Sequence, residues 1–309
     1  MHVTLQQLKL FHAVVKHGGF TRAAQEMHLT QPAVSIQIKR LEDHIGLPLF
    51  EHVGRKTHMT LAGRELFDAC SDVIERLDSL AATIDSLKGE ISGPLRISVV
   101  TTAKYFLPHL LGAFVQEYPK VNPSLTVTNR ANVLQRLEDN LDDVVIMGQV
   151  PEGMKVEAFP FLENVLVVVA PPDHPYADGR LVTLEQLARE RMLVREEGSG
   201  TRIAMGKLFA SRNLTPTFHM ELGSSEAIKQ GVMAKLGVAV LSLHSLHLEL
   251  SMGRIAMLNV EGFPQRRPWY AVYNHGKRHT LAVTRFIQFL TEKGSEAAVA
   301  PIRDSMESQ

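Results

Sequence analysis

Residues 11–63 read FHAVVKHGGFTRAAQEMHLTQPAVSIQIKRLEDHIGLPLFEHVGRKTHMTLAG, and this stretch decides the fold of the N-terminal part of the chain. Apolar residues recur at helical spacing from residue 5 to residue 15, and a glycine pair then ends the run, which predicts a first helix. Thr21 is a candidate N-cap of a short second helix, whose alanines let a neighbour approach closely. A sharp turn is expected near Leu29.

A third helix is predicted to begin after that turn. Thr30 is a good N-cap residue, and Pro32 is tolerated in the first turn of a helix. Apolar residues then follow at positions i, i+4, i+7 and i+11, which is the spacing of one helical face. The buried stripe of this helix is predicted to consist of Val34, Ile38, Leu41 and Ile45.

The opposite side of the third helix has a composition that suits the major groove of DNA. Glutamine and serine can hydrogen-bond base edges, lysine and arginine can contact phosphates, and an exposed isoleucine can contact a thymine methyl group. The alternative is a solvated helix face. The order of short helix, turn and third helix favours a helix-turn-helix. We therefore expect DNA contacts from Thr30, Gln31, Pro32, Ser35, Ile36, Lys39 and Arg40.

A β-hairpin is predicted after the third helix, because Gly54-Arg55-Lys56-Thr57 lies between two β-compatible stretches. Arg55 and Lys56 are expected at its tip, where cations can bind phosphate or enter the minor groove; otherwise they keep an exposed loop soluble.

The charge of the chain is uneven. Its net charge is zero, but residues 1–60 hold seven Lys or Arg against four Asp or Glu, 7 − 4 = +3, so the remainder carries −3.

The quoted run is similar to the DNA-binding signature of the LysR-type transcriptional regulators, over some fifty residues with the spacing intact. The resemblance implies a winged helix-turn-helix domain over residues 1–60. One position departs from the pattern: many relatives have arginine at the start of the wing, where this chain has His52.

A long helix is predicted over residues 61–88, with Thr60 as its cap. Seven apolar residues on it alternate spacings of four and three, which is a heptad seam. Either a partner chain or the chain's own domain must cover such a seam, and we expect a partner, that is, a homodimer through residues 60–88. The seam consists of Leu66, Cys70, Val73, Leu77, Leu80, Ile84 and Leu87. Cys70, the single cysteine, is interpreted as a packing residue and excludes an intramolecular disulfide. The resemblance further implies assembly into homotetramers.

The sequence from residue 89 predicts a hinge and a second domain. Gly89 to Pro94 breaks the helix and is interpreted as the hinge, because glycine and proline punctuate regular structure. β-rich runs then alternate with helical segments, which predicts a parallel-sheet α/β domain over residues 95–292. Lobe I is expected at about 95–164 and 269–292, and lobe II at about 165–268. A mobile tail is expected over residues 293–309. The fold class is therefore α/β: an all-α winged helix-turn-helix, a dimerisation helix, and a two-lobed domain like the periplasmic binding proteins.

Ligands of such sheets bind in the cleft beyond the carboxyl ends of the strands. Thr101 and Thr102 follow the first strand and are expected to open a helix, where free backbone N–H groups welcome an anion. Residues 197–202, Glu-Gly-Ser-Gly-Thr-Arg, form a glycine-rich turn into a second helix, although nearby carboxylates would repel an anion. The candidate effector contacts are Thr101, Thr102, Arg130, Ser199, Thr201 and Arg202; a surface salt bridge is the alternative for Arg130.

Four further strings resemble the CbbR-type regulators of carbon-dioxide-fixation (RuBisCO) operons: TTAKYFLPHLLGAF, NRANVLQRLEDN, DDVVIMGQVPEG and REEGSGTR. This resemblance implies activation of such operons in response to a phosphorylated metabolite or NADPH, with RNA polymerase as a further partner and no required cofactor. A LysR-type regulator of another pathway, such as amino-acid or aromatic catabolism, remains the nearer alternative. A solute-binding protein remains the alternative of a different class.

Other functions are disfavoured. No catalytic motif occurs in a suitable context, so we expect no enzyme activity. His244 with His247, or His275 with His279, could share a helix face, but neither pair has an adjacent carboxylate or cysteine to complete a metal site. The longest apolar stretch, residues 164–172, is far shorter than the ~20 residues of a membrane span. No secretion signal is recognised, and a cytoplasmic location is expected.

Overall fold

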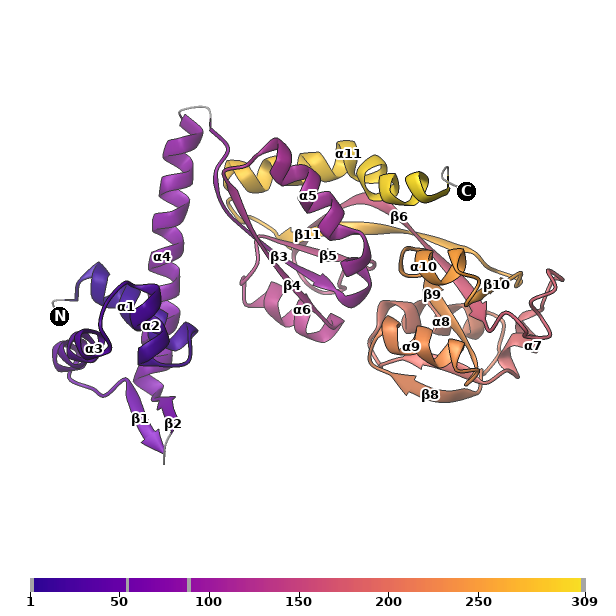
Figure 1. Cartoon of the computed structure of the whole chain (residues 1–309), viewed down its shortest axis with the longest axis horizontal. Helices are drawn as coiled ribbons and strands as arrows, with labels where there is room; N and C mark the ends of the chain where they lie inside the picture. Colours follow the sequence, from indigo (N-terminus) through magenta and orange to yellow (C-terminus); the bar gives the residue numbers. More distant parts are fainter. Residues whose placement is uncertain (1–2, 54–55, 88–89, 307–309) are drawn as a thin grey trace. The chain divides into compact units, whose positions relative to one another are not determined.

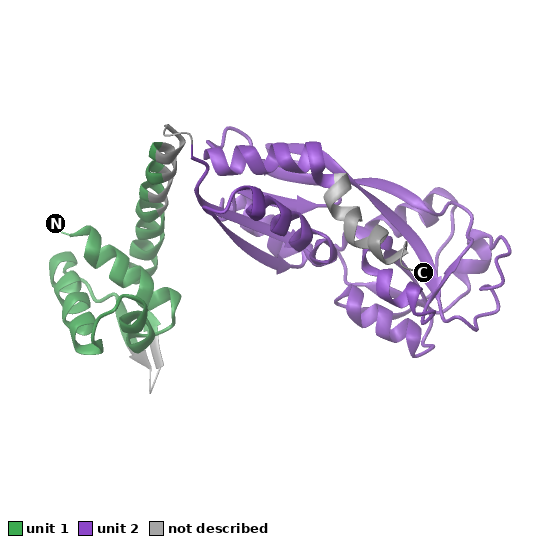
Figure 2. Ribbon diagram, turned by 45° about the horizontal axis from the view of Figure 1, so that its top comes forward, with its two compact units in different colours: residues 1–84 green, residues 85–309 purple. Residues whose placement is uncertain are grey.

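The structure is a computed structural model that describes residues 3–53, 56–87 and 90–306 (Figure 1). The chain divides into two compact units, residues 1–84 and residues 85–309 (Figure 2). Each unit is described by itself below.

The first unit is helical with one small hairpin. Its helices are α1 (Leu5–Lys16), α2 (Phe20–Glu26), α3 (Gln31–Ile45) and the long α4 (Leu61–Leu87). The strands β1 (Phe50–Val53) and β2 (Lys56–Met59) pair antiparallel. These elements follow the order predicted from the sequence, including the hairpin and the long helix.

The second helix begins earlier than predicted. Gly19 is its N-cap, and Thr21 lies inside the helix, so the predicted cap was wrong. Two glycines allow the chain to turn here, because Gly18 has a φ of 67° that favours glycine. The turn also brings the Phe20 ring to 5.5 Å from the ring of Phe50, which ties the start of α2 to the hairpin.

The core of this unit includes the first turns of α4. Cys70 is 1% exposed and packs with residues of α1, α2 and α3. Gly63 permits this packing, because a Cβ there would lie 2.3 Å from the carbonyl oxygen of Leu49. Leu66 is partly buried and packs against the same core, so at Cys70 the predicted seam is covered by the chain itself and not by a partner. An isolated heptad pattern does not reveal which of its turns are already covered within the chain.

The second unit is built on one large sheet. Its strands are β3 (Gly93–Val100), β4 (Val121–Thr128), β5 (Val144–Met147), β6 (Val156–Ala170), β7 (Met192–Arg195), β8 (Phe218–Leu222), β9 (Val238–Ser242), β10 (Ala256–Leu258) and β11 (Gln265–Asn274). Their order is β4-β3-β5-β11-β6-β9-β7-β8, with β10 also paired to β6. The pairs around β3 and β7 are parallel, as predicted, but β6 and β11 run antiparallel to their neighbours. The sheet is therefore mixed.

Two layers of helices cover this sheet. They are α5 (Leu107–Glu117), α6 (Arg130–Glu138), α7 (Leu184–Ala188), α8 (Gly200–Ser211), α9 (Ser225–Met233), α10 (His247–Ser251) and α11 (Leu281–Met306), with the 3-10 helices η1 (Thr101–Tyr105) and η2 (Leu243–Ser245). Alternate residues of β5 divide between the layers: Val144 and Ile146 pack with α5 and α11, whereas Val145 and Met147 pack with α6. The helices α5 and α6 accordingly lie on opposite sides of the strands (Figure 1).

Two separate sets of hydrophobic clusters divide the unit into lobes. Phe161 and Leu162 of β6 belong to the cluster with α5 and α11, whereas Leu166 and Val168 belong to the cluster with α7 and α8. The strands β6 and β11 each run from one lobe into the other. The predicted two-lobed α/β fold class is confirmed.

Three boundaries differ from the sequence-based expectations. The strand β3 already begins at Gly93, so the last two residues of the predicted hinge are paired with β4. A 3-10 helix follows β3, and α5 begins only at Leu107 with a proline in its first turn. The last helix continues to Met306, into the part of the chain that was expected to be a tail. Long-range pairing and packing set these ends, and local propensity does not report them.

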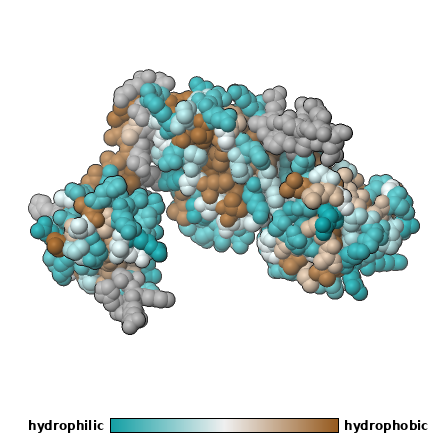
Figure 3. Space-filling view, in the orientation of Figure 1, coloured by the Kyte–Doolittle hydropathy of each residue, from teal (hydrophilic) through white to brown (hydrophobic). Residues whose placement is uncertain are grey.

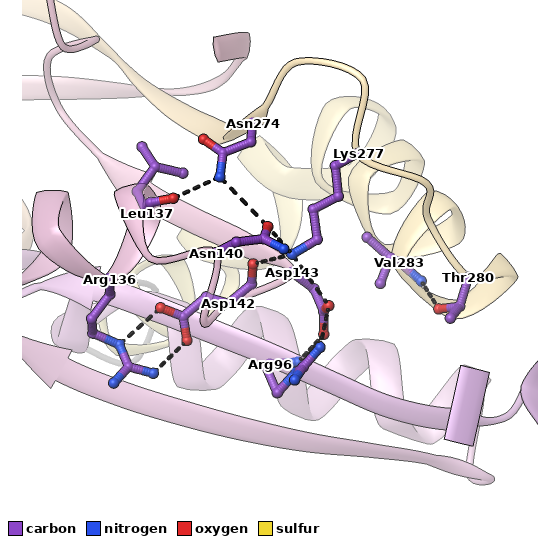
Figure 4. Close-up of polar contacts among 10 residues, drawn as sticks. All are labelled: Arg96, Arg136, Leu137, Asn140, Asp142, Asp143, Asn274, Lys277, Thr280 and Val283. Carbon is purple, nitrogen blue, oxygen red and sulfur yellow. Dashed lines mark hydrogen bonds and ion pairs between the residues drawn. The ribbon is translucent and has the colours of Figure 1, made fainter. Parts of the chain in front are cut away.

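A polar network fastens the edge of lobe I where β3 and β5 begin (Figure 4). Asp143 accepts hydrogen bonds from the backbone N–H of Arg96 at 2.8 Å and from its Nη2 at 3.0 Å. Asp142 accepts two from Arg136 of α6, at 2.8 and 2.7 Å. Lys277, in the loop before α11, donates to the carbonyl oxygen of Asp142 at 2.7 Å. The network thus joins a strand, a helix and a loop that are distant in sequence.

Among the described helices, none combines the length and apolar character that crossing a membrane requires.

Candidate functional site

The helix α3 is fixed by its buried side and its cap. The side-chain oxygen of Thr30 accepts a hydrogen bond from the backbone N–H of Ala33 at 3.4 Å, and Pro32 lies in the first turn, as predicted. Val34, Ile38 and Leu41 are at most 3% exposed. Because this stripe is held in the core, the opposite side of α3 must face away from it.

That outer side carries exposed polar and charged groups. Gln31 donates a hydrogen bond from Nε2 to the Ser35 side-chain oxygen at 2.9 Å, which orders two groups able to contact base edges. Lys39 pairs with Asp43 at 3.7 Å, but both side chains are mostly exposed. Such a pair contributes only ~0–1 kcal/mol, so the lysine is easily released to a phosphate. Ile36 is 53% exposed, although burial of its apolar surface would be favourable.

The remaining predicted DNA contacts lie at the hairpin. Arg55 is outside the described residues. Lys56 begins β2, where its backbone pairs with Val53, and its side chain is outside the described part. The structure thus places a hairpin where the wing was expected.

An apolar seam follows the exposed side of α4. Val73, Leu77, Leu80 and Ile84 are 41%, 37%, 55% and 44% exposed. Hydrophobic residues are visible at the surface along this helix (Figure 3). Four large apolar side chains in a row are costly to leave in water, so the seam is a candidate interface. The last predicted member, Leu87, has a side chain outside the described part.

A cleft of about 440 Å³ of empty space lies between the two lobes of the second unit. It is bordered by the end of β3, the end of β7, the start of α8 and the middle of β6 and β11. Its lining residues are Val100, Thr101, Thr102, Arg130, Gly148, Asn164, Arg195, Glu196, Ser199, Gly200, Thr201, Arg267 and Trp269. Five of the six predicted effector contacts are among them.

The sixth, Arg202, does not line this cleft. Its guanidinium pairs with the carboxylate of Glu221, donates to the carbonyl oxygen of Arg195 and lies over the ring of Phe218. The helix α8 begins at Gly200, so Arg202 points from its first turn toward β8 and not into the cleft. The prediction for this residue is therefore not supported by its position.

The sequence analysis missed Arg195, which is the most deeply buried charge of the cleft at 4% exposure. Its Nη2 donates to the side-chain oxygen of Thr101 at 2.9 Å, and its Nη1 donates to that of Ser225 at 3.1 Å. The carboxylate of Glu196 accepts two further hydrogen bonds from it, both at 2.7 Å. An arginine that ends an otherwise apolar strand, Met192–Arg195, was the available signal.

Two other arginines in the cleft have uncharged partners and no carboxylate partner among the described residues, and Nη1 of Arg130 also lies 3.9 Å from Sδ of Met147. Arg130 donates to the carbonyl oxygen of Gln149 at 2.9 Å, and Arg267 donates to that of Gly200 at 3.2 Å. Burial lowers the pKa of both guanidinium groups, and the charge of Arg130 lowers the pKa of Arg267 further. A buried cation whose pKa is lowered by a second cation nearby lies in a site that favours an anion.

Unsatisfied polar atoms mark the same site. Nε of Arg267, Nε1 of Trp269 and Oε1 of Gln149 are buried and have no hydrogen-bond partner among the described residues. Buried polar groups are normally paired, so such groups at a cleft indicate a ligand-binding role. Gly148 keeps space open here, because a Cβ on it would lie 3.6 Å from the ring of Trp269. In the described part of the chain, no group of three or more histidine, cysteine or acidic side chains is arranged to hold a metal ion.

Two known families match this chain. Residues 5–64 match the family described as "Bacterial regulatory helix-turn-helix protein, lysR family". Residues 88–295 match the family described as "LysR substrate binding domain". The first match covers α1 to α3 and the hairpin, and the second covers both lobes of the large unit.

The chain also resembles individual proteins over its whole length. A "RuBisCO operon transcriptional regulator" of Allochromatium vinosum is 47% identical over 298 residues, which are 96% of this chain and 98% of that protein. The "HTH-type transcriptional activator CmpR" of Synechocystis is 42% identical over 301 residues, 97% and 99% of the two chains. Among solved structures, the regulatory domain of Synechocystis CcmR "in complex with 2-PG" is 40% identical, with a TM-score of 0.62 over 64% of this chain and 95% of that one.

Proposed function

Because this chain belongs to the LysR family of bacterial transcription regulators, we propose that it activates carbon-dioxide-fixation (RuBisCO) operon genes in response to a small anionic metabolite. It is a regulator and not an enzyme. The observation that carries the proposal is the interlobe cleft, where Arg130 and Arg267 have no described carboxylate partner. The full-length similarity to a RuBisCO operon regulator supports the choice of operon.

The proposed DNA contacts come from the outer side of α3 and from the hairpin. Gln31, Ser35 and Ile36 would contact bases, and Lys39 and Arg40 would contact phosphates, because their side chains lie on the side of α3 away from the core. Arg55 and Lys56 of the wing complete the proposal. A dimer formed through the α4 seam would present two recognition helices to a palindrome, and two dimers would form a tetramer. For a protein that binds chromosomal DNA we propose a cytoplasmic location, with RNA polymerase as a further partner.

The proposed effector contacts are Thr101, Thr102, Arg130, Ser199 and Thr201, to which the structure adds Arg195 and Arg267. The guanidinium groups of Arg130 and Arg267, which have no described carboxylate partner, suit a phosphate or a carboxylate. A small phosphorylated metabolite is favoured over NADPH by the similarity to the CcmR regulatory domain, which is solved in complex with 2-PG.

The experiment is a gel shift and footprint with the palindromic promoter fragment of a RuBisCO operon, with and without 2-PG. We expect binding that weakens with salt, by about 0.9 log units per phosphate contact for each tenfold increase. We also expect 2-PG to change the footprint. The proposal is wrong if purified protein ignores such fragments even at low ionic strength. Calorimetry with 2-PG, NADPH and aromatic acids separates it from a regulator of another pathway.

A further inference from the structure

Four charged side chains line the effector cleft, and they divide into two groups. Arg130 and Arg267 have backbone carbonyl partners. Arg195 instead faces Glu196, the single carboxylate among the lining residues. The lining therefore carries three positive charges and one negative charge, 3 − 1 = +2. An anion that enters this cleft meets two available cations and one that is already neutralised.

Glu196 holds Arg195 in the geometry that a ligand would use. Its Oε2 accepts from Nε and its Oε1 accepts from Nη2, both at 2.7 Å. This is the bidentate arrangement by which a guanidinium binds a carboxylate or a phosphate. The Arg195 side chain is 4% exposed and that of Glu196 is 23% exposed, so the arginine is fixed while the carboxylate borders the open space.

The same arginine joins the two lobes. Thr101, which accepts a hydrogen bond from Arg195, lies in η1 of lobe I. Ser225, the other hydroxyl partner, begins α9 of lobe II. Whatever occupies the bidentate position on Arg195 therefore acts on a group that contacts both lobes.

We propose that Glu196 is a resident counter-anion of this cleft, which occupies on Arg195 the bidentate position that an anionic group of the effector takes on binding. The inference rests on the proposed effector function of the cleft. Glu196 then determines specificity. A ligand with one anionic group is held by Arg130 and Arg267 alone, whereas a ligand with two anionic groups also displaces Glu196 from Arg195.

The local backbone permits this displacement. Glu196 lies between the end of β7 and the start of α8, and Gly198 in that turn has a φ of 79°. The side chain is covered only in part, so it can move into solvent without removing a core residue. When the effector binds, the Arg195 guanidinium therefore exchanges Glu196 for an anionic group of the effector. The same guanidinium also contacts Thr101 and Ser225, so the exchange alters a link between the two lobes.

The test is the variant Glu196→Gln in the full-length protein. Glutamine keeps the size of the side chain and one acceptor oxygen but removes the negative charge. By calorimetry, we expect Glu196→Gln to bind 2-PG, which carries a phosphate and a carboxylate, about tenfold more tightly than the original protein, which corresponds to ~1.4 kcal/mol. Sulfate, a single anionic group, should gain less than twofold. The matched control is Glu197→Gln, since Glu197 is exposed, adjacent and not part of the lining. We expect this control to change affinity by less than twofold.

Three results overturn the inference. If Glu196→Gln binds 2-PG with unchanged affinity, the carboxylate of Glu196 does not compete with the ligand. Weaker affinity means that Glu196 positions Arg195 for the ligand and does not oppose it. An equal gain in Glu197→Gln means that only the general charge of the loop matters. If Glu196→Gln does not fold, Glu196→Ala is measured with the same expectation.

These outcomes are separable from a failure of the proposed function. A protein that binds 2-PG and changes its footprint, but shows no tightening in Glu196→Gln, retains the proposed function and loses this inference. A protein whose footprint never responds to an anion loses the proposed function, whereas the calorimetric affinities of the two proteins for 2-PG, compared with those for sulfate, still decide the role of Glu196.

Discussion

Asp142 and Asp143 are consecutive acids at the start of β5, and each has its own cationic partner. Asp142 has a side chain that is 1% exposed and accepts both of its short hydrogen bonds from Arg136. The hydrogen bonds that Arg136 donates to Asp142 raise the pKa of Arg136. Buried charges are tolerated in this way only when they are paired, so removal of one partner leaves an uncompensated group.

We expect Asp142→Asn to lower the free energy of unfolding by about 2–4 kcal/mol, since breaking a buried pair costs ~3–5 kcal/mol and Arg136 is partly exposed. The measurement is urea unfolding followed by the fluorescence of Trp269, the single tryptophan, which is 2% exposed in lobe I. The control is Glu138→Gln, which removes an exposed acid from α6, the helix that carries Arg136. This variant should change the free energy of unfolding by less than ~0.5 kcal/mol. Equal effects of the two variants would contradict the prediction.

His244 makes stability depend on pH. Its Nε2 lies 2.8 Å from the carbonyl oxygen of Glu163, and its ring lies 5.1 Å from that of Phe106. Burial lowers the pKa of His244 below the ordinary 6.5, so the folded state prefers the neutral ring. The unfolded state takes up a proton first as the pH falls. The contribution to stability is therefore complete above pH 6.5 and is lost as the pH falls toward the lowered folded-state pKa.

We expect the free energy of unfolding to fall less in His244→Gln than in the original protein when the pH is lowered from 7.5 to 5.5, because glutamine does not titrate. Urea midpoints at the two pH values measure this difference. His219→Gln, at an exposed position of β8, should lose as much as the original protein. A decline in His244→Gln as large as that of the original protein would show that another group causes it.

At the scale of elements, α3 and α4 each divide into a buried and an exposed part. On α3, the apolar stripe that starts at Val34 is buried, and the opposite side of the helix carries polar groups. The first turns of α4 complete the core through Cys70, where burial raises the thiol pKa to about 11. A thiol with this pKa stays protonated at neutral pH, which agrees with a packing role. The later turns of α4 expose the seam.

We expect Leu80→Glu to weaken dimerisation at least 100-fold, because burying a leucine contributes ~1.5–3 kcal/mol and a dimer contains two copies. Sedimentation of the full-length protein over a concentration series measures this change. Asp72→Lys alters charge on α4 away from the seam and should leave the dimer intact. If Leu80→Glu remains dimeric at the same concentrations, the seam is not the interface.

On α3, we expect two substitutions to have different effects on DNA binding. Ser35→Ala should lower the ratio of specific to non-specific affinity several-fold, since a good base contact contributes ~1–3 kcal/mol of discrimination. Arg40→Ala should weaken both affinities alike and reduce the salt slope by about 0.9. Gel shifts with operator and random DNA at three salt concentrations measure both quantities. Identical behaviour of the two variants would argue against this division of roles.

At the scale of the whole molecule, regulation requires the cleft to influence DNA binding. We propose that the effector draws the two lobes together and that differential affinity for the two arrangements supplies the energy. Direct polar contacts between lobes already border the cleft. The side-chain oxygens of Thr102 and Ser225 are 3.5 Å apart, and the hydroxyl of Tyr105 donates to Glu226 at 3.0 Å.

We expect Thr102→Ala to leave DNA affinity without effector within twofold and to reduce the response of the footprint to 2-PG. The reason is that Thr102 lines the cleft in the second unit, whereas the proposed DNA contacts belong to the first. Titration of the footprint with 2-PG measures the response. Loss of DNA binding in Thr102→Ala, comparable to that of Arg40→Ala, would refute the separation of the two functions.

The sequence determined the elements wherever local signals were strong. Thr30 and Pro32 marked the start of α3, and the spacing of Val34, Ile38 and Leu41 gave its buried side. The hairpin predicted after the third helix is likewise present, as the antiparallel pair β1 and β2. Periodicity and capping are properties of neighbouring residues, so a sequence suffices to read them.

The tertiary structure alone decided which charges are free. Arg202 was predicted in the cleft but pairs with Glu221 of β8, and Arg195 was missed although it contacts both lobes. The antiparallel course of β6 and β11 brings Arg267 to the cleft beside Arg130, which lies more than a hundred residues earlier. Burial and pairing depend on residues that are distant in sequence. The sequence pattern therefore indicates which cationic residues are candidates for the cleft. Only the tertiary structure determines which of them remain available to bind an anion.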